Sequence, residues 1–219
     1  MGKEIDLLFN YPKTKRNLGE RAESKTEVDR AIAREFGFDF FDGDRRHGYG
    51  GFKYMPRFWQ PVIPTFKEYW ALSSSSSVLD VGCAKGFMMY DMAELIPGIT
   101  VKGIDVSAYA IENAILSMHP HVQVADARKL PFADKSFDVT ISINTIHNLD
   151  RNDCAQALRE IERVSCRGAF VTVDAYRNDE EKDRMTAWNL TARTIMSVEE
   201  WVSFFDEVGY TGDYFWFIP

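Results

Sequence analysis

The stretch Val78-Leu79-Asp80-Val81-Gly82-Cys83-Ala84-Lys85-Gly86 decides the fold of this chain. An apolar run typical of a buried strand leads directly into a turn with two glycines, and a helical pattern begins at Phe87. The two glycines permit a tight turn and let a ligand touch the backbone. The free N–H groups of the new helix would point at that ligand. A strand–helix turn without any ligand is the alternative interpretation of such a glycine pattern.

The next apolar run ends in an acidic residue, Asp105, which occupies the position that holds the paired hydroxyls of a ribose in nucleotide-binding sheets. This coincidence favours a ligand over an empty turn. Short apolar runs continue along the chain, at residues 78–81, 99–104, 122–125, 139–143 and 169–173, and helical periods lie between them, at residues 87–96, 108–118 and 153–165. Strand–helix alternation of this kind predicts a doubly wound, mainly parallel α/β sheet with helices on both faces.

The two ends of the chain predict further elements. A capping box formed by Ser197 and Glu200 opens a helix that runs to about residue 208, and residues 214–218 follow as an edge strand. Near the other end, Ser24 and Glu27 form a second capping-box pattern, and Gly37 is placed to end that helix.

The first part of the chain differs in composition from the rest. Residues 42–54 are rich in glycine, aromatic and charged residues, with neither a helical nor a strand period, and residues 57–72 carry two prolines that predict a kink or a late helix start. A run of serines at 73–77 reads as a short linker. We therefore expect a helical and aromatic lid over residues 1–72 and a ligand-binding domain over residues 73–219.

Composition limits the function. The chain has 219 residues, of which 45% are hydrophobic and 27% charged, so wholesale disorder is excluded. A net charge of −7 makes nucleic acid and anionic membranes poor partners. The start lacks an apolar signal core, and three cysteines without a CxxC motif fit a reducing, cytoplasmic location. We expect no metal site, and we expect His119 and His121 to be solvated loop residues.

Three features together resemble the class I S-adenosylmethionine-dependent methyltransferases. They are the motif Asp80-x-Gly82-x-x-x-Gly86, the acidic residue Asp105, and residues 126–138 (DARKLPFADKSFD). The resemblance covers about residues 78–173 and implies a Rossmann-like fold. The chain departs from the family pattern at Ala84, where many members have glycine, and a seventh strand is expected to be missing or irregular.

The resemblance implies S-adenosylmethionine as the cofactor, and it assigns the glycine turn to the methionine portion. Asp80, Gly82 and Gly86 would shape the loop beneath that portion. Lys85 could reach a carboxylate, but we expect its side chain to be solvated.

The resemblance assigns the nucleoside end of the cofactor to residues that follow the next two strands. Asp105 would take the ribose hydroxyls, and Val106 would lie against the adenine face. The Asp126 side chain would accept a hydrogen bond from the adenine amino group, and the Ala127 N–H would donate to the ring. Each has an alternative, since Val106 could be ordinary core and Asp126 could cap the next turn.

Catalytic candidates follow the fourth and fifth strands. Asn144 is placed to face the reacting centre and bind an amine or a carboxylate. His147 is the general-base candidate, with capping of the next segment as its alternative. Tyr176 could lay its ring on the sulfonium of the cofactor or pack at the rim on Trp188.

The aromatic lid supplies the remaining candidates. In the superfamily, additions at the N-terminus usually cover the cofactor and build the acceptor pocket. Tyr49, Tyr54 and Trp59 are therefore lid candidates, with Tyr54 also assigned to the cofactor. For Trp59, packing of the appendage onto the sheet is the preferred interpretation.

Three functions fit these features. The first is methyl transfer to a small molecule in bacterial biosynthesis. Residues 42–54 and the tail (residues 188–192 and 209–214) also resemble a bacterial subgroup of the superfamily, and that resemblance implies the second function. It is cyclisation of S-adenosylmethionine itself to azetidine-2-carboxylate and methylthioadenosine, in which Tyr176 would hold the sulfonium and Asn144 would orient the amine. The third is a non-catalytic scaffold that only binds the compound. The sequence does not predict the oligomeric state.

Overall fold

The computed structural model of the chain describes residues 2–13 and 25–219. Its centre is a seven-stranded sheet with the order β3-β2-β1-β4-β5-β6, in which β7 also pairs with β5. The strands are β1 Ser77–Val81, β2 Thr100–Asp105, β3 Val122–Val124, β4 Phe137–Ile143, β5 Ser165–Tyr176, β6 Met196–Ser197 and β7 Asp213–Phe217. All of these strand pairings are parallel. The predicted Rossmann-like fold class is therefore confirmed.

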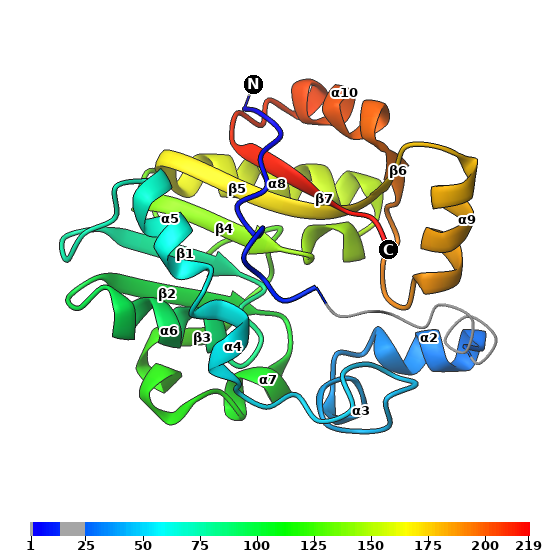
Figure 1. Cartoon of the computed structure of the whole chain (residues 1–219), viewed down its shortest axis with the longest axis horizontal. Helices are drawn as coiled ribbons and strands as arrows, with labels where there is room; N and C mark the ends of the chain where they lie inside the picture. Colours follow the sequence, from blue (N-terminus) through cyan, green and yellow to red (C-terminus); the bar gives the residue numbers. More distant parts are fainter. Residues whose placement is uncertain (1, 14–24) are drawn as a thin grey trace.

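Helices cover both faces of the sheet (Figure 1). They are α2 Glu27–Ala33, α3 Phe38–Phe41, α4 Pro56–Trp59, α5 Ile63–Tyr69, α6 Phe87–Leu95, α7 Ala108–Glu112, α8 Arg151–Val164, α9 Asp179–Trp188 and α10 Val198–Val208, with the 3-10 helices η1 Leu116–His121 and η2 Ile146–Asn148. Neighbouring residues of one strand serve opposite cores. Val78 packs in the cluster that contains α5 and α6, whereas Leu79 packs in the cluster that contains α8 and α10. This two-sided burial explains why the strands read as continuous apolar runs.

The far edge of the sheet ends irregularly. β6 has only two residues, and β7 runs beside β5 as the predicted edge strand. The N-terminal stretch lies along β7, where the Ile5 N–H donates to the Tyr214 carbonyl at 3.0 Å and Leu7 is buried. The sequence predicts six strands; the seventh is present, and it is the two-residue β6, which gave no sequence signal.

Two helix predictions are wrong in their bounds. The helix expected over residues 108–118 ends at Glu112, because the chain turns at Asn113 and the Ile115 N–H then donates to the Lys85 carbonyl. The N-terminal capping box is formed by Thr26 and Asp29. The predicted Ser24 lies outside the described residues.

Short helices build the N-terminal segment. α2 ends at Ala33, well before Gly37, which instead precedes α3. The predicted break over residues 57–72 is confirmed, since α4 and α5 are separate helices, and Pro64 lies in the first turn of α5 where no amide hydrogen is needed. The serine run forms a hydrogen-bonded turn, and its last member, Ser77, already belongs to β1.

Candidate functional site

The loop after β1 lies at the point where the strand order reverses, because β1 has β2 on one side and β4 on the other. Gly82 and Gly86 have φ angles of +88° and +75°, and Ala84 has +48°. A Cβ at Gly82 would lie 2.1 Å from Oγ1 of Thr145, so only glycine lets the loops after β1 and β4 pack together. The loop departs from the family pattern at Ala84, which adopts the left-handed conformation nonetheless.

Asp105 joins the end of β2 to this loop. Its Oδ2 accepts a hydrogen bond from the Ala84 N–H at 2.8 Å, and its Oδ1 accepts one from the Ser107 N–H at 2.8 Å. Burial raises the pKa of this carboxyl, while the two N–H donors oppose that rise. The adjacent Val106 is 60% exposed, so its apolar side chain stands at the surface beside a buried carboxylate.

Asp80 lies beneath the same loop, near the end of β1. It is 5% exposed, and burial together with the charge of Asp105 raises its pKa to about 8. The carboxyl therefore keeps its proton over much of the neutral range, which lets two acidic residues share one buried region.

The carboxylate of Asp126 faces an arginine. Its oxygens accept hydrogen bonds from the Arg128 guanidinium, and Oδ1 also accepts from the Arg128 backbone N–H at 2.8 Å. Arg128 extends the contact to Asp153. Hydrogen bonds from Arg128 outweigh partial burial and lower the pKa of Asp126. The structure thus contains the expected turn cap, and the assignment of Asp126 and Ala127 to adenine stays a prediction.

Lys85 corrects the sequence analysis. The expectation of a solvated side chain is wrong, because Lys85 is 6% exposed and its ammonium donates to Oδ2 of Asp42 at 2.5 Å and to the Phe52 carbonyl at 3.1 Å. Tyr109 donates to the same Asp42 oxygen at 2.6 Å. The N-terminal segment is therefore fastened directly to the glycine loop, by a lysine whose partner lies 43 residues upstream.

The rings of the N-terminal segment extend this contact over the loop. Tyr49 stacks on Phe52 with ring centroids 4.2 Å apart, and Phe52 lies 4.8 Å from Phe87 at the start of α6. Tyr49 is 52% exposed as a residue, and desolvation of its hydroxyl, with smaller electrostatic contributions from Tyr11 and Asp105, raises its pKa to about 12.

The other two lid candidates make packing contacts. The Tyr54 hydroxyl donates to Oδ1 of Asp91 on α6 at 2.6 Å. Trp59 meets Tyr11 edge-on, with ring centroids 5.0 Å apart. Trp59 therefore has the packing environment that we preferred for it, whereas Tyr54 contacts the helix that follows the glycine loop.

A cavity of about 210 Å³ opens beside these elements, at the carboxyl ends of β4 and β5. Its lining comes from the loop after β4, from Asp174 on β5, from the N-terminal segment and from the residues around the end of α9; the main polar and aromatic members are Asn144, His147, Asn148, Asp174, Tyr49 and Trp188. The structure thus brings two catalytic candidates, Asn144 and His147, to one space with the lid candidate Tyr49.

Asn144 enters this cavity from a left-handed backbone position, with φ of +50°. Its Oδ1 accepts a hydrogen bond from Oγ1 of Thr172 at 2.8 Å. This bond uses the side-chain oxygen of Asn144, so the amide NH₂ is the group that could donate to a ligand.

His147 is almost fully buried. Its Nδ1 accepts a hydrogen bond from the Asp174 backbone N–H at 3.0 Å, and its Nε2 lies 3.7 Å from Oδ1 of Asp174. Burial lowers the pKa of His147, although the Asp174 charge opposes this. These contacts indicate a neutral ring with its proton on Nε2, whose Nδ1 accepts the hydrogen bond from the Asp174 backbone. The role of His147 as a general base stays a prediction.

Tyr176 points elsewhere. Its hydroxyl donates to Glu200 at 3.4 Å, and the ammonium of Lys182 lies 5.4 Å from its ring centroid. It is absent from the described lining of the cavity. Trp188, its expected packing partner, has its ring 6.0 Å from that of Phe217.

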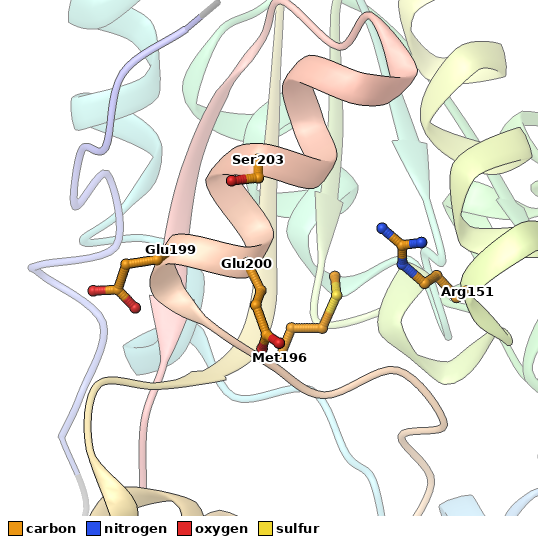
Figure 2. A pocket seen from close by; sticks show the side chains of 5 residues that line it. All are labelled: Arg151, Met196, Glu199, Glu200 and Ser203. Atoms are coloured by element: carbon orange, nitrogen blue, oxygen red, sulfur yellow. The ribbon is translucent and has the colours of Figure 1, made fainter.

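A second hollow of about 340 Å³ lies between the start of α8 and the first turns of α10, and its lining includes Glu200, the hydrogen-bond partner of Tyr176. Figure 2 shows that its lining is Arg151, Met196, Glu199, Glu200 and Ser203. These residues lie outside the glycine loop and the cavity, so this hollow is not part of the candidate site.

Comparisons with known proteins agree with this geometry. A family profile described as a methyltransferase domain matches residues 79–173. A malonyl-[acyl-carrier protein] O-methyltransferase of Legionella pneumophila is 30% identical over 134 residues, which are 59% of this chain and 46% of that protein. Residues 79–173 therefore form a methyltransferase domain of the class I S-adenosylmethionine-dependent type. S-adenosylmethionine is accordingly its cofactor.

Solved structures support the fold of this methyltransferase chain. The YcgJ protein of Bacillus subtilis matches with a TM-score of 0.54 and 20% identity, covering 67% of this chain and 66% of that one. The [4+2]-cyclase SpnF matches with a TM-score of 0.56 and 23% identity, covering 77% and 62%. The chain spans about a third to a half of the length of the first curated relatives that it matches. In the parts of the chain that the structure describes, every helix is too short or too polar to span a membrane.

Two residues that line the cavity were not predicted by the sequence analysis. Asp174 was visible as a polar residue near the end of a strand, which is the position that places ligand contacts in such sheets. Asn148 gave no sequence signal, because its place in the cavity depends on η2, a single turn after β4.

Proposed function

We propose that this chain transfers a methyl group from S-adenosylmethionine to a small acceptor molecule. The observation that carries the proposal is the position of the cavity at the ends of β4 and β5, next to the glycine loop and Asp105. Its size suits a small acceptor, and the segment that lines it from the N-terminal side is the one fastened by Lys85. Within the lid expected over residues 1–72, we propose that residues 36–54 cover the site, whereas Leu7, Ile63 and Phe66 are buried in the core of the domain expected over residues 73–219.

The residues present suit the cofactor. The Asp105 carboxylate accepts two backbone bonds, and two carboxylate oxygens offer about four lone-pair sites, so it keeps capacity for ribose hydroxyls. Val106 offers an exposed apolar face for adenine beside it. Asp126 and the Ala127 N–H would meet the adenine edge, and Gly82 and Gly86 would lie under the methionine portion.

Bound S-adenosylmethionine supplies a methyl carbon that is already activated on a sulfonium. The chain then has to hold the acceptor in line and keep water away, which are the tasks of the cavity and the lid. The lone pair of the acceptor forms the new bond to the methyl carbon as the carbon–sulfur bond breaks, its electrons pass to sulfur, and an acceptor that carries a proton releases it to solvent. Asn144 would orient the acceptor through its amide NH₂.

A second candidate is cyclisation of S-adenosylmethionine itself. The small volume of the cavity and its aromatic lining favour it, because the reaction needs no separate acceptor. The α-amine of the compound would form a bond to its own Cγ as the bond from Cγ to sulfur breaks, giving azetidine-2-carboxylate and methylthioadenosine. In this reaction Asn144 would orient the amine, and Tyr176 would have to exchange Lys182 for the sulfonium.

One set of incubations separates the candidates. The full chain is mixed with S-adenosylmethionine alone and, separately, with added small acceptors, and the products are identified by mass spectrometry. S-adenosylhomocysteine that forms only with an acceptor supports the transferase. Methylthioadenosine with azetidine-2-carboxylate supports the cyclase, and binding without either product supports a non-catalytic scaffold.

Binding is tested independently by calorimetry with S-adenosylhomocysteine. Asp105→Asn removes one of the two carboxylate oxygens that face the Ala84 and Ser107 amides, and it should weaken binding at least tenfold. Asp134→Asn, whose side chain is 76% exposed, is the matched control and should bind normally. No heat with the wild-type chain would contradict the proposed function.

A further inference from the structure

The cavity contains an acceptor atom that the fold leaves without a partner. Oδ1 of Asn148 is buried and makes no hydrogen bond, whereas the NH₂ of the same amide donates weakly to the Asn144 carbonyl at 3.5 Å. A buried polar atom without a partner costs about 1–3 kcal/mol, so such atoms are rare unless a ligand completes them. A ligand in the cavity that carries an N–H or O–H group would therefore satisfy the Asn148 oxygen.

A second acceptor lies in the same lining. Asp174 is 7% exposed, and its backbone is already used on both sides, since the N–H donates to His147 and the carbonyl accepts from Trp201. The backbone contacts hold the residue rigidly at the end of β5. The carboxylate brings several lone pairs to the cavity, so it can receive a ligand's N–H in addition to its other contacts.

The rest of the lining suits a cation better than an anion. Tyr49 and Trp188 supply ring faces, which attract positive charge, and the Lys25 ammonium already lies 5.4 Å from the Trp188 ring centroid, so the Tyr49 ring is the one offered to a ligand. Within the described lining, Lys25 is the one permanent cation, and its ammonium donates to the Trp188 carbonyl. Lys25 is thus held by the backbone, while the carboxylate of Asp174 and the oxygen of Asn148 would repel a carboxylate ligand.

We propose that this cavity selects an amine, with Asp174 and Asn148 accepting its N–H bonds and the Tyr49 ring flanking it; this rests on the proposed function only for the source of the methyl group. The cavity volume corresponds to roughly seven water-sized groups at about 30 Å³ each. It therefore accommodates a small amine or the amine-bearing end of a larger molecule. The amine is either that of a separate acceptor or the α-amine of S-adenosylmethionine.

The selectivity is tested with three probes that share one ring and differ in their polar head: benzylamine, benzyl alcohol and benzoate. Each is titrated into the full chain, with and without S-adenosylhomocysteine, and binding is followed by ligand-detected NMR. An ammonium carries three donors, an alcohol one and a carboxylate none. We expect benzylamine to bind at least tenfold more tightly than the other two. Equal binding, or a preference for benzoate, overturns the proposal.

Two variants locate the effect. Asp174→Asn should remove most of the preference for benzylamine, and Asn148→Leu should reduce it while leaving benzyl alcohol nearly unchanged. Asp150→Asn is the control, because this carboxylate is in the neighbouring turn, is 68% exposed and pairs with Arg193. If both cavity variants still bind benzylamine as the wild type does, the amine site lies elsewhere and the proposal is overturned. Circular dichroism confirms that each variant is folded before binding is measured.

The same measurements keep this proposal separate from the proposed function. If S-adenosylhomocysteine fails to bind while the amine preference holds, the cofactor assignment fails and the amine site stands. If S-adenosylhomocysteine binds and the preference is absent, only the amine site fails. Mass spectrometry then distinguishes the sources of the amine: N-methylbenzylamine indicates a separate acceptor, and methylthioadenosine formed without benzylamine indicates the cofactor's own α-amine.

Discussion

The ammonium of Lys85 lies 2.5 Å from Oδ2 of Asp42, which joins the glycine loop of the methyltransferase domain to the N-terminal segment. The side chains are 8% and 23% exposed, and Tyr109 and the Phe52 N–H bind the same carboxylate. Although partial burial opposes it, these donors lower the pKa of Asp42, so this carboxyl is ionised at neutral pH. The contact makes the N-terminal segment and the glycine loop one connected unit.

Breaking this pair should loosen the N-terminal segment and weaken cofactor binding together. Lys85→Met leaves the Asp42 carboxylate without its cation, and breaking a buried pair costs about 3–5 kcal/mol. We expect lower stability in urea, faster proteolysis within residues 36–54 and roughly tenfold weaker S-adenosylhomocysteine binding. Arg46→Met is the control, since its pair with Asp44 is more than half exposed and should contribute less than about 1 kcal/mol. Loss of stability with unchanged affinity would separate the segment from the cofactor loop.

Much of the fold could be predicted because its strands are buried on both faces. Val78 and Leu79 serve different cores, and continuous apolar runs of this kind mark a parallel sheet in any such sequence. Predictions from local sequence patterns were wrong where a tertiary contact sets the end of a helix. The apolar stripe over residues 108–118 predicts one helix, but the bond from Ile115 to the Lys85 carbonyl redirects the chain after α7.

The site was predictable only where a residue follows a strand or a glycine turn. Asp105, Asn144 and His147 were found in this way, because strand ends meet at one edge of the sheet. The partner of Lys85 could not be found, since Asp42 lies in a segment without a helical or strand period. Asn148 likewise depends on one turn of 3-10 helix, and its unpartnered oxygen has no sequence signature.

A second prediction concerns Tyr54 and Asp91. Asp91 is fully buried on α6, its Oδ2 has no partner, and its Oδ1 accepts from the Tyr54 hydroxyl at 2.6 Å and from Gln60 at 3.2 Å. Tyr54→Phe removes the stronger donor and should cost about 1–3 kcal/mol in urea unfolding. Combining it with Asp91→Leu should recover part of that loss.

The control for this pair is Tyr90→Phe. The Tyr90 ring lies 5.1 Å from that of Tyr54, so the change alters the same cluster without touching the Asp91 carboxylate. A loss for Tyr90→Phe as large as that for Tyr54→Phe would show that ring packing dominates and would reject the hydrogen bond as the cause.

A third prediction uses the buried carboxyl of Asp80. Its pKa is about 8 in the folded chain and 3.8 in a model peptide, so the folded state binds more protons between these values. Stability contributed at this position must therefore fall as pH rises from about 4 to 8. Asp80→Asn removes this titration. The free energy of unfolding of the variant, relative to that of the wild type, should therefore rise by on the order of a few kcal/mol between pH 5 and pH 8. Urea unfolding at both values, with Asp134→Asn as the exposed control, measures it; an equal difference at both pH values would contradict the burial argument.

A fourth prediction decides what His147 can do. Because Nδ1 accepts from the Asp174 N–H and burial lowers the pKa, the ring should be neutral with its proton on Nε2 near pH 7. The unfolded state binds more protons from the lowered folded pKa up to 6.5, so wild-type stability should fall as pH drops through this window. His147→Asn keeps an acceptor near the Asp174 amide, cannot titrate there and should lose this dependence. Nitrogen NMR shifts of the ring, with His119 and His121 as exposed and half-buried references, report the tautomer directly. A lone pair on Nε2 would restore His147 as the general base, whereas a proton there limits it to holding Asp174 in place.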